Sequence, residues 1–184
     1  MTGSTAGSRQ WAPLRRSAFV RHQRGAVAIE FGLLAVPFFM IVGAILETSL
    51  VFLSSQILET AVQDASRHIR TGQAAAEAFE PGDFRARICG HTWGLFGDCS
   101  GLFIKVAPID NFQAAIIQAP VDPECEQDCT WTEDQDYDGG AASSYMLVQA
   151  YYRWPVLLDF PGLSSLADGT RLMGSAAIFR NEPF

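Results

Sequence analysis

The chain has 184 residues, which is close to the size of one domain with accessory segments. Its formal net charge is −7, but residues 1–25 hold five arginines and no acidic residue. The remainder therefore carries eight basic residues against twenty acidic ones. Such an acidic body argues against nucleic-acid binding, which needs a clustered basic face.

The first 25 residues predict a disordered basic tail, because small and polar side chains leave little apolar surface to bury. Arginines that precede an apolar segment tend to stay in the cytoplasm. We therefore expect residues 1–25 to be a cytoplasmic leader or orienting tail. The acidic remainder is expected in the periplasm or outside the cell.

Residues 26–53 predict a transmembrane helix. Of these 28 residues only Glu30 and Glu47 are charged, and as a helix they would extend about 42 Å, enough to cross a bilayer. A soluble core helix and a cleaved secretory signal peptide are the alternatives, and the run is longer than the apolar core of a signal peptide. The expected protein is single-pass with a cytoplasmic N-terminus.

Two residues of this run call for an explanation. An acidic residue inside a membrane costs about 2–3 kcal/mol, so Glu30 is expected to have a partner or a function. The alternative is that Glu30 reaches back to water or pairs with Arg24, whereas Glu47 is expected near the outer headgroups. Pro37 removes a helical hydrogen bond and predicts a kink or local unwinding near residues 33–37.

The junction at Gly25 resembles a type IV prepilin cleavage site. A basic leader ends at Gly25, and the following AVAIEF places Glu30 and Phe31 just inside the apolar helix. The stretch 25–73 resembles the TadE-like family of tight-adherence (Flp-type) pilus assembly proteins, described as pseudopilins processed by a dedicated prepilin peptidase. The segments YRWP at 152–155 and FRNEPF at 179–184 are similar to the tail of these proteins.

The resemblance implies a minor pilin or pseudopilin of the bacterial inner membrane, retained there or incorporated into a surface pilus. Cleavage would fall between Gly25 and Ala26. The new amino group of one subunit would pair with Glu30 of its neighbour, and Glu30 and Phe31 would set subunit register. The implied partners are other pilins and pseudopilins, the pilus assembly machinery, the prepilin peptidase and the lipid bilayer, with no cofactor. An uncleaved, membrane-anchored periplasmic binding or adhesion module is the alternative.

Residues 54–72 are predicted to extend the helix beyond the membrane. Apolar residues recur there at helical spacing and form one stripe, and Gly72 is the expected stop. We expect this stripe to pack on the protein's own domain; packing on a partner protein is the alternative. Its members are Ile57, Leu58, Ala61, Val62, Ala65 and Ile69.

Residues 73–184 predict a periplasmic α+β domain. A helical piece over 73–88 is interrupted at 80–83, and Asp83 is the expected cap of its second part. Three strands are expected in an antiparallel sheet, which gives a pilin-like plan of a long helix followed by a small sheet. These strands are 102–107, 145–154 and 171–180.

Four cysteines, Cys89, Cys99, Cys125 and Cys129, all follow the predicted span. An even number in an oxidising compartment favours disulfides, and of the three possible pairings Cys89–Cys99 with Cys125–Cys129 is the most local. Zinc binding is the competing interpretation, which the absence of CxxC pairs disfavours.

The acidic segment DQDYDG contains Asp134, Asp136 and Asp138 in the spacing of half a calcium loop. The twelfth position is Tyr145 instead of glutamate, so a solvated acidic turn is the better interpretation and calcium a weak candidate. The chain also lacks the sequence patterns of serine hydrolases, phosphate-binding loops and zinc proteases. We therefore expect a protein that is not an enzyme.

Overall fold

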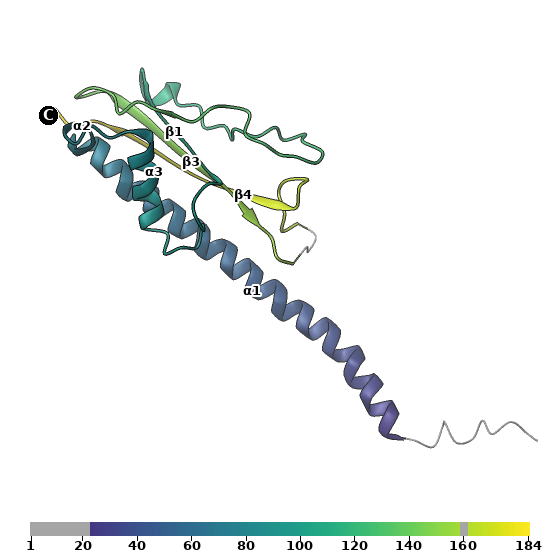
Figure 1. Ribbon diagram of the computed structural model, residues 1–184. Helices are drawn as coiled ribbons and strands as arrows, with labels where there is room; N and C mark the ends of the chain where they lie inside the picture. The colour runs from purple at the N-terminus through teal and green to yellow at the C-terminus, as the bar shows by residue number, and fades with distance from the viewer. Residues whose placement is uncertain (1–22, 159–161) are drawn as a thin grey trace, which may run out of the picture. The chain divides into compact units, whose positions relative to one another are not determined.

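The computed structural model describes residues 23–158 and 162–184, so the predictions made for residues 1–22 lie outside the described residues. Figure 1 shows one long helix, a sheet, and the short helices α2 and α3 close to the later part of the long helix. The helices are α1 (Gln23–Arg70), α2 (Gln73–Ala76) and α3 (Pro81–Gly90), with a 3-10 turn η1 (Phe112–Ala114). The strands are β1 (Leu102–Ile109), β2 (Asp136–Tyr137), β3 (Tyr145–Pro155) and β4 (Thr170–Arg180).

Helix α1 is continuous over 48 residues, which confirms both the long apolar helix and its extension. It ends where basic side chains occupy its last turn, a favourable place for positive charge near the helix C-terminus. Gly72 follows in the left-handed conformation, with φ of +76°, and turns the chain toward α2. By its contacts the chain divides into a unit that ends at Val42 and a second unit from Gly43 to Phe184.

The short helix α3 begins with a reciprocal capping arrangement. Glu80 is the N-cap residue, Pro81 is the first helical residue, and the Asp83 side chain accepts a hydrogen bond from the Glu80 N–H at 3.0 Å. The prediction of Asp83 as the cap was therefore wrong by three positions. Proline at the first helical position moves the helix start ahead of Asp83.

The sheet has the strand order β2-β1-β3-β4. The three predicted strands are all present, and β3 pairs antiparallel with both β1 and β4. The short strand β2 was not predicted, and it pairs parallel with β1, with Lys105 opposite Asp136. The α+β class is confirmed, and the three expected strands pair antiparallel as predicted, while the short β2 adds a parallel pairing that makes the sheet mixed. After β1 the chain folds back so that β2 lies at the outer edge of the sheet and runs parallel to β1.

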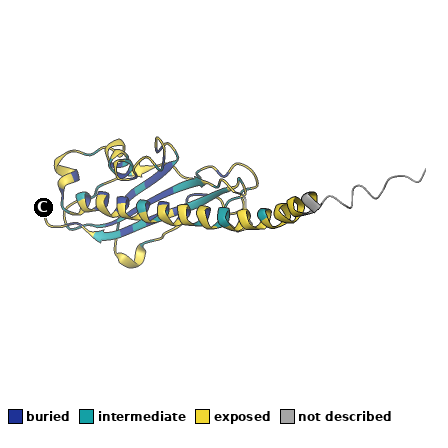
Figure 2. Ribbon diagram, turned by 90° about the horizontal axis from the view of Figure 1, so that it is seen from below, coloured by how far each residue is buried: buried dark blue, intermediate teal, exposed yellow. Residues whose placement is uncertain are grey.

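The hydrophobic core of the second unit lies between the later part of α1, helix α3 and the sheet, and Figure 2 shows buried residues in the strands. The predicted stripe of α1 does pack on the protein's own domain. From α1 the core includes Leu58, Ala61, Val62, Ala65 and Ile69, and from the rest of the domain Phe84, Ile88, Phe96, Ile104, Val106, Met146, Val148, Ala150, Met173 and Ala177.

The residues that follow β4 return to the end of α1. The Glu182 N–H donates to the Arg70 carbonyl oxygen at 2.9 Å. The Phe184 ring lies so close to Gly72 that a Cβ there would be 2.4 Å from a ring carbon. Buried Asn181 donates to the carbonyl oxygens of Gly139 and Ala141 at 3.1 and 3.0 Å. These contacts join the last described residues to the helix end and to the turn before β3.

Candidate functional site: the exposed apolar helix

Residues 27–46 of α1 expose a largely apolar surface. Among the described residues, one helix is long and apolar enough to cross a membrane, with a mean hydropathy of 2.3 in its most apolar window. None of that window is buried within the protein. So large an exposed apolar surface is typical of a segment made for lipid or for partner helices. The helix is therefore consistent with a single-pass membrane anchor.

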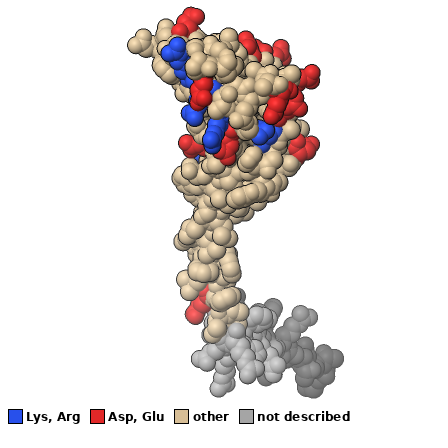
Figure 3. Space-filling model, turned by 90° about the vertical axis from the view of Figure 1, so that its left-hand side faces the viewer, with Lys and Arg blue, Asp and Glu red and all other residues tan. Residues whose placement is uncertain are grey.

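Large apolar side chains point outward on all sides of this segment, in contrast to the one-sided stripe farther along α1. They are Val27, Ile29, Phe31, Leu33, Leu34, Val36, Phe38, Phe39, Met40, Ile41, Ile45 and Leu46. In Figure 3 the helical stretch beside the grey residues carries little charge, whereas charged side chains gather on the surface of the domain.

Glu30 is exposed in the first part of this apolar surface. It lies one helical turn after Ala26 and about 25 Å along the axis before Glu47. The Gly25–Ala26 peptide bond falls in the first turn of α1, and a Cβ at Gly25 would meet no atom within 4 Å. The predicted cleavage site and the predicted register residues Glu30 and Phe31 are thus close together on one accessible helical segment.

Pro37 lies inside α1 without interrupting it. Every residue from 33 to 37 remains α-helical, so of the two expected effects of Pro37 the structure shows no local unwinding there. A bend centred on Pro37 stays a prediction. The helix tolerates the missing donor because only one hydrogen bond of the long ladder is lost.

Glu47 has a partner within the protein that the sequence did not reveal. Its expected place near the lipid headgroups stays a prediction, but the side chain is buried, with only 3% of its surface exposed. Its Oε1 accepts a hydrogen bond from the Leu157 N–H at 3.0 Å, across 110 positions of the sequence. The carboxylate is thus the acceptor for a backbone group in the connection between β3 and β4. In the sequence, the one indication that Glu47 has a partner was its position among apolar residues of the helix.

The same connection contacts α1 one turn earlier. A Cβ on Gly43 would lie 2.8 Å from the Leu158 Cδ1, so the absence of a side chain at Gly43 makes room for Leu158. Two separate contacts therefore hold residues 157–158 against residues 43–47 of the helix. Both residues stay partly exposed, with 75% of Leu157 and 42% of Leu158 accessible.

Replacing Glu47 by alanine should lower the free energy of unfolding by about 1–3 kcal/mol, because the Leu157 N–H loses its acceptor. The amide of Leu157 should also exchange faster with deuterium. Glu59→Ala is the matched control, since Glu59 is an exposed glutamate on the same helix. Equal amide exchange in the two variants would show that the Glu47–Leu157 bond does not hold the connection.

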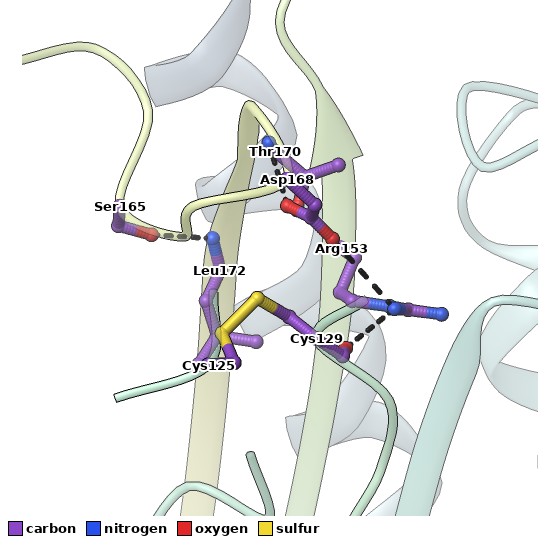
Figure 4. A network of polar contacts seen from close by, with 7 residues as sticks. All are labelled: Cys125, Cys129, Arg153, Ser165, Asp168, Thr170 and Leu172. Carbon is purple, nitrogen blue, oxygen red and sulfur yellow. Dashed lines mark hydrogen bonds and ion pairs between the residues drawn. A yellow bond between two sulfur atoms is a disulfide. The ribbon is translucent and has the colours of Figure 1, made fainter. Parts of the chain in front are cut away.

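Both disulfides form in the local pairing, Cys89–Cys99 and Cys125–Cys129, so the zinc interpretation was wrong. The second disulfide belongs to a polar network around Arg153, shown in Figure 4. Arg153 donates to the Cys129 carbonyl oxygen and lies 3.8 Å from an Asp168 carboxylate oxygen. Asp168 in turn accepts from the Thr170 N–H at 2.9 Å. The network joins the disulfide loop to both ends of the β3–β4 connection.

The acidic segment forms turn and strand structure. Asp136 is part of β2, and the Asp138 carboxylate accepts from the Gly140 N–H at 2.8 Å. Over residues 23–158 and 162–184 the structure has no group of three or more His, Cys, Asp or Glu side chains that could hold a metal ion. The Asp136 carboxylate accepts from the adjacent Tyr137 N–H, so Asp136 and Asp138 both bind backbone N–H groups of their own segment.

Three tyrosines near the sheet have altered acidity. Burial raises the pKa of Tyr137, Tyr151 and Tyr152 above the ordinary value, and nearby carboxylates contribute less. Burial disfavours the phenolate, so these rings stay neutral to higher pH than a free tyrosine. Their contacts are aromatic: Tyr152 lies edge-on to Phe96 at 4.5 Å between centroids. These tyrosines contribute packing contacts within the domain.

Comparison with known proteins gave one match. No curated protein and no solved structure matches the chain. The model of the family described as "TadE-like protein" matches residues 25–67. The match begins at Gly25, includes Glu30 and ends in the part of α1 that packs on the domain. The part of the chain that matches the TadE-like family therefore runs from the predicted cleavage site through the exposed helix to the core stripe.

Proposed function

We propose that this protein is a minor pilin or pseudopilin that takes part in assembling a tight-adherence pilus after its leader is removed. The observation that carries the proposal is the exposed apolar helix with Glu30 five positions after Gly25, inside a segment that matches the TadE-like family. In this proposal residues 1–25 are cytoplasmic, as their arginines favour, and the domain is periplasmic. The protein acts by association and is not an enzyme.

Leader removal would change the chemistry at the start of the helix. Cleavage after Gly25 frees a positively charged amino group at Ala26, four residues before Glu30. A carboxylate surrounded by lipid is stabilised by an adjacent positive charge. An amino group from a neighbouring subunit can supply that charge and fix the axial offset between the two helices. Other pilins, pseudopilins and the prepilin peptidase are the partners that this proposal requires.

Exposure of the helix supports association within the membrane. Its apolar side chains point outward on every side over residues 27–46, so lipid and neighbouring helices can both be contacted. Small residues such as Gly25, Ala28 and Gly32 allow close approach of another helix near Glu30.

Mass spectrometry of the native protein tests the cleavage. We expect a mature chain that begins at Ala26, and we expect Gly25→Leu to retain the leader. Gly32→Leu is the matched control, because a Cβ at either glycine would meet no atom within 4 Å. An intact leader in the wild-type protein would contradict the proposal and favour an uncleaved, membrane-anchored binding or adhesion module.

A further inference from the structure

The start of the β3–β4 connection lies at a defined position along α1. The Leu157 N–H bonds to Glu47, and Leu158 fills the space left by Gly43. Near its other end, residues 165 and 168 of the connection are held by the Arg153–Asp168 ion pair and by a hydrogen bond from the Leu172 N–H to the Ser165 hydroxyl (Figure 4). Residues 157–158 are therefore fixed beside residues 43–47 of the helix.

The length of the apolar segment places those helix residues at the membrane boundary. A hydrocarbon layer of about 30 Å is crossed by about 20 helical residues, which counted from Ala26 reach Ile45 or Leu46. The burial pattern changes near the same point, because one face of α1 becomes buried from Glu47 and Val51 onward, while Phe52 and Leu53 on other faces are still exposed. The hydrocarbon edge on the domain side then falls between Gly43 and Glu47.

We propose that Leu157 and Leu158 insert into the lipid at this edge and give the domain a second membrane contact beside the helix. Both are exposed leucines, and they lie beside Glu47 and Gly43, where the exposed apolar segment of α1 ends. Lipid is the occupant because Gly43 and Glu47 follow directly on the part of α1 that the bilayer would surround. The inference requires the membrane span of the proposed function, but neither leader cleavage nor pilus assembly.

Glu47 acquires a specific role in this arrangement. An irregular segment can enter the apolar layer only if its backbone polar groups have partners. Glu47 supplies the acceptor for the Leu157 N–H and is itself shielded from its surroundings. Gly43 permits the close approach that puts Leu158 against the helix. A buried carboxylate in an apolar helix is thereby explained as a positioning residue for the lipid-contacting loop.

Photo-crosslinking to lipid tests the inference. A diazirine amino acid is placed at position 157, 116 or 34 of the full chain, reconstituted into vesicles of phosphatidylethanolamine and phosphatidylglycerol. Ile116 is the matched negative control, because it is 74% exposed, as Leu157 is 75% exposed, but lies in the segment between β1 and β2. Leu34, 72% exposed in the apolar helix, reports on the span itself.

We expect abundant lipid adducts at positions 34 and 157, at least several-fold above those at position 116. Adducts at 34, with position 157 no higher than 116, would overturn the inference and leave the membrane span intact. Adducts from 157 to protein alone would also overturn it, in favour of a protein partner. Absence of lipid adducts at 34 would overturn both the span and the inference.

Discussion

Glu30→Ala should leave the protein in the membrane but reduce its recovery in assembled pili by about tenfold or more. Loss of a charge pair that contributes about 1.4–2.8 kcal/mol to docking lowers subunit association by about 10–100-fold. Insertion should not suffer, because removal of an acidic residue makes the helix more apolar. The measurement compares mature protein in the sheared pilus fraction with that in the membrane fraction.

Three variants separate charge from shape at this position. Glu30→Gln keeps the size but not the charge, so it should resemble Glu30→Ala, whereas Glu30→Asp should retain part of the function. Glu59→Ala removes an exposed glutamate from the domain part of the same helix and should behave as wild type. Normal pilus recovery in both Glu30→Ala and Glu30→Gln would refute a pairing role for the carboxylate.

Removal of the Cys89–Cys99 disulfide should destabilise the domain by about 3 kcal/mol. The bond closes a loop over a sequence separation of 10, which restricts the unfolded chain. Cys99 is also buried in the main core, and Cys89 packs against it, so alanine at both positions leaves a small void in addition. The measurement is denaturant unfolding of the full chain in detergent, followed by near-ultraviolet circular dichroism.

The Cys125–Cys129 disulfide provides the comparison. Its sequence separation is 4, so the same loop argument gives about 2 kcal/mol. The double alanine variant at 125 and 129 should therefore be less destabilised than the variant at 89 and 99. It should disturb the loop that carries the Cys129 carbonyl oxygen, which accepts from Arg153. The opposite order of stabilities would contradict the loop-length explanation.

Local patterns predicted the long elements well. The apolar run and the stripe from Ile57 to Ile69 anticipated α1, and its buried face agrees with the stripe. The three long strands were found from β-branched and apolar content between prolines, and each extends the predicted range by at most two residues at either end. These elements could be predicted because the periodicity of apolar side chains is visible within a short stretch of neighbouring residues.

Features that depend on distant contacts were missed. Strand β2 has two residues and forms only because the acidic segment returns to β1. The burial of Glu47 was not foreseen, because its partner, Leu157, follows 110 positions later and binds through its backbone. Every residue except proline has a backbone N–H, so the amino-acid sequence does not indicate which of them a side chain will bind. Of the candidate site, the junction and Glu30 were therefore predictable, and the loop beside Gly43 was not.

The return of the last described residues to the end of α1 sets when the domain can fold during synthesis. β4 adds Met173 and Ala177 to the core, and Glu182 then bonds to Arg70, which precedes it by 112 positions. Because such long-range contacts form late, the stripe on α1 stays partly uncovered until residues 170–184 have been made. A ribosome stalled before Thr170 would leave an apolar helix face open to misassociation.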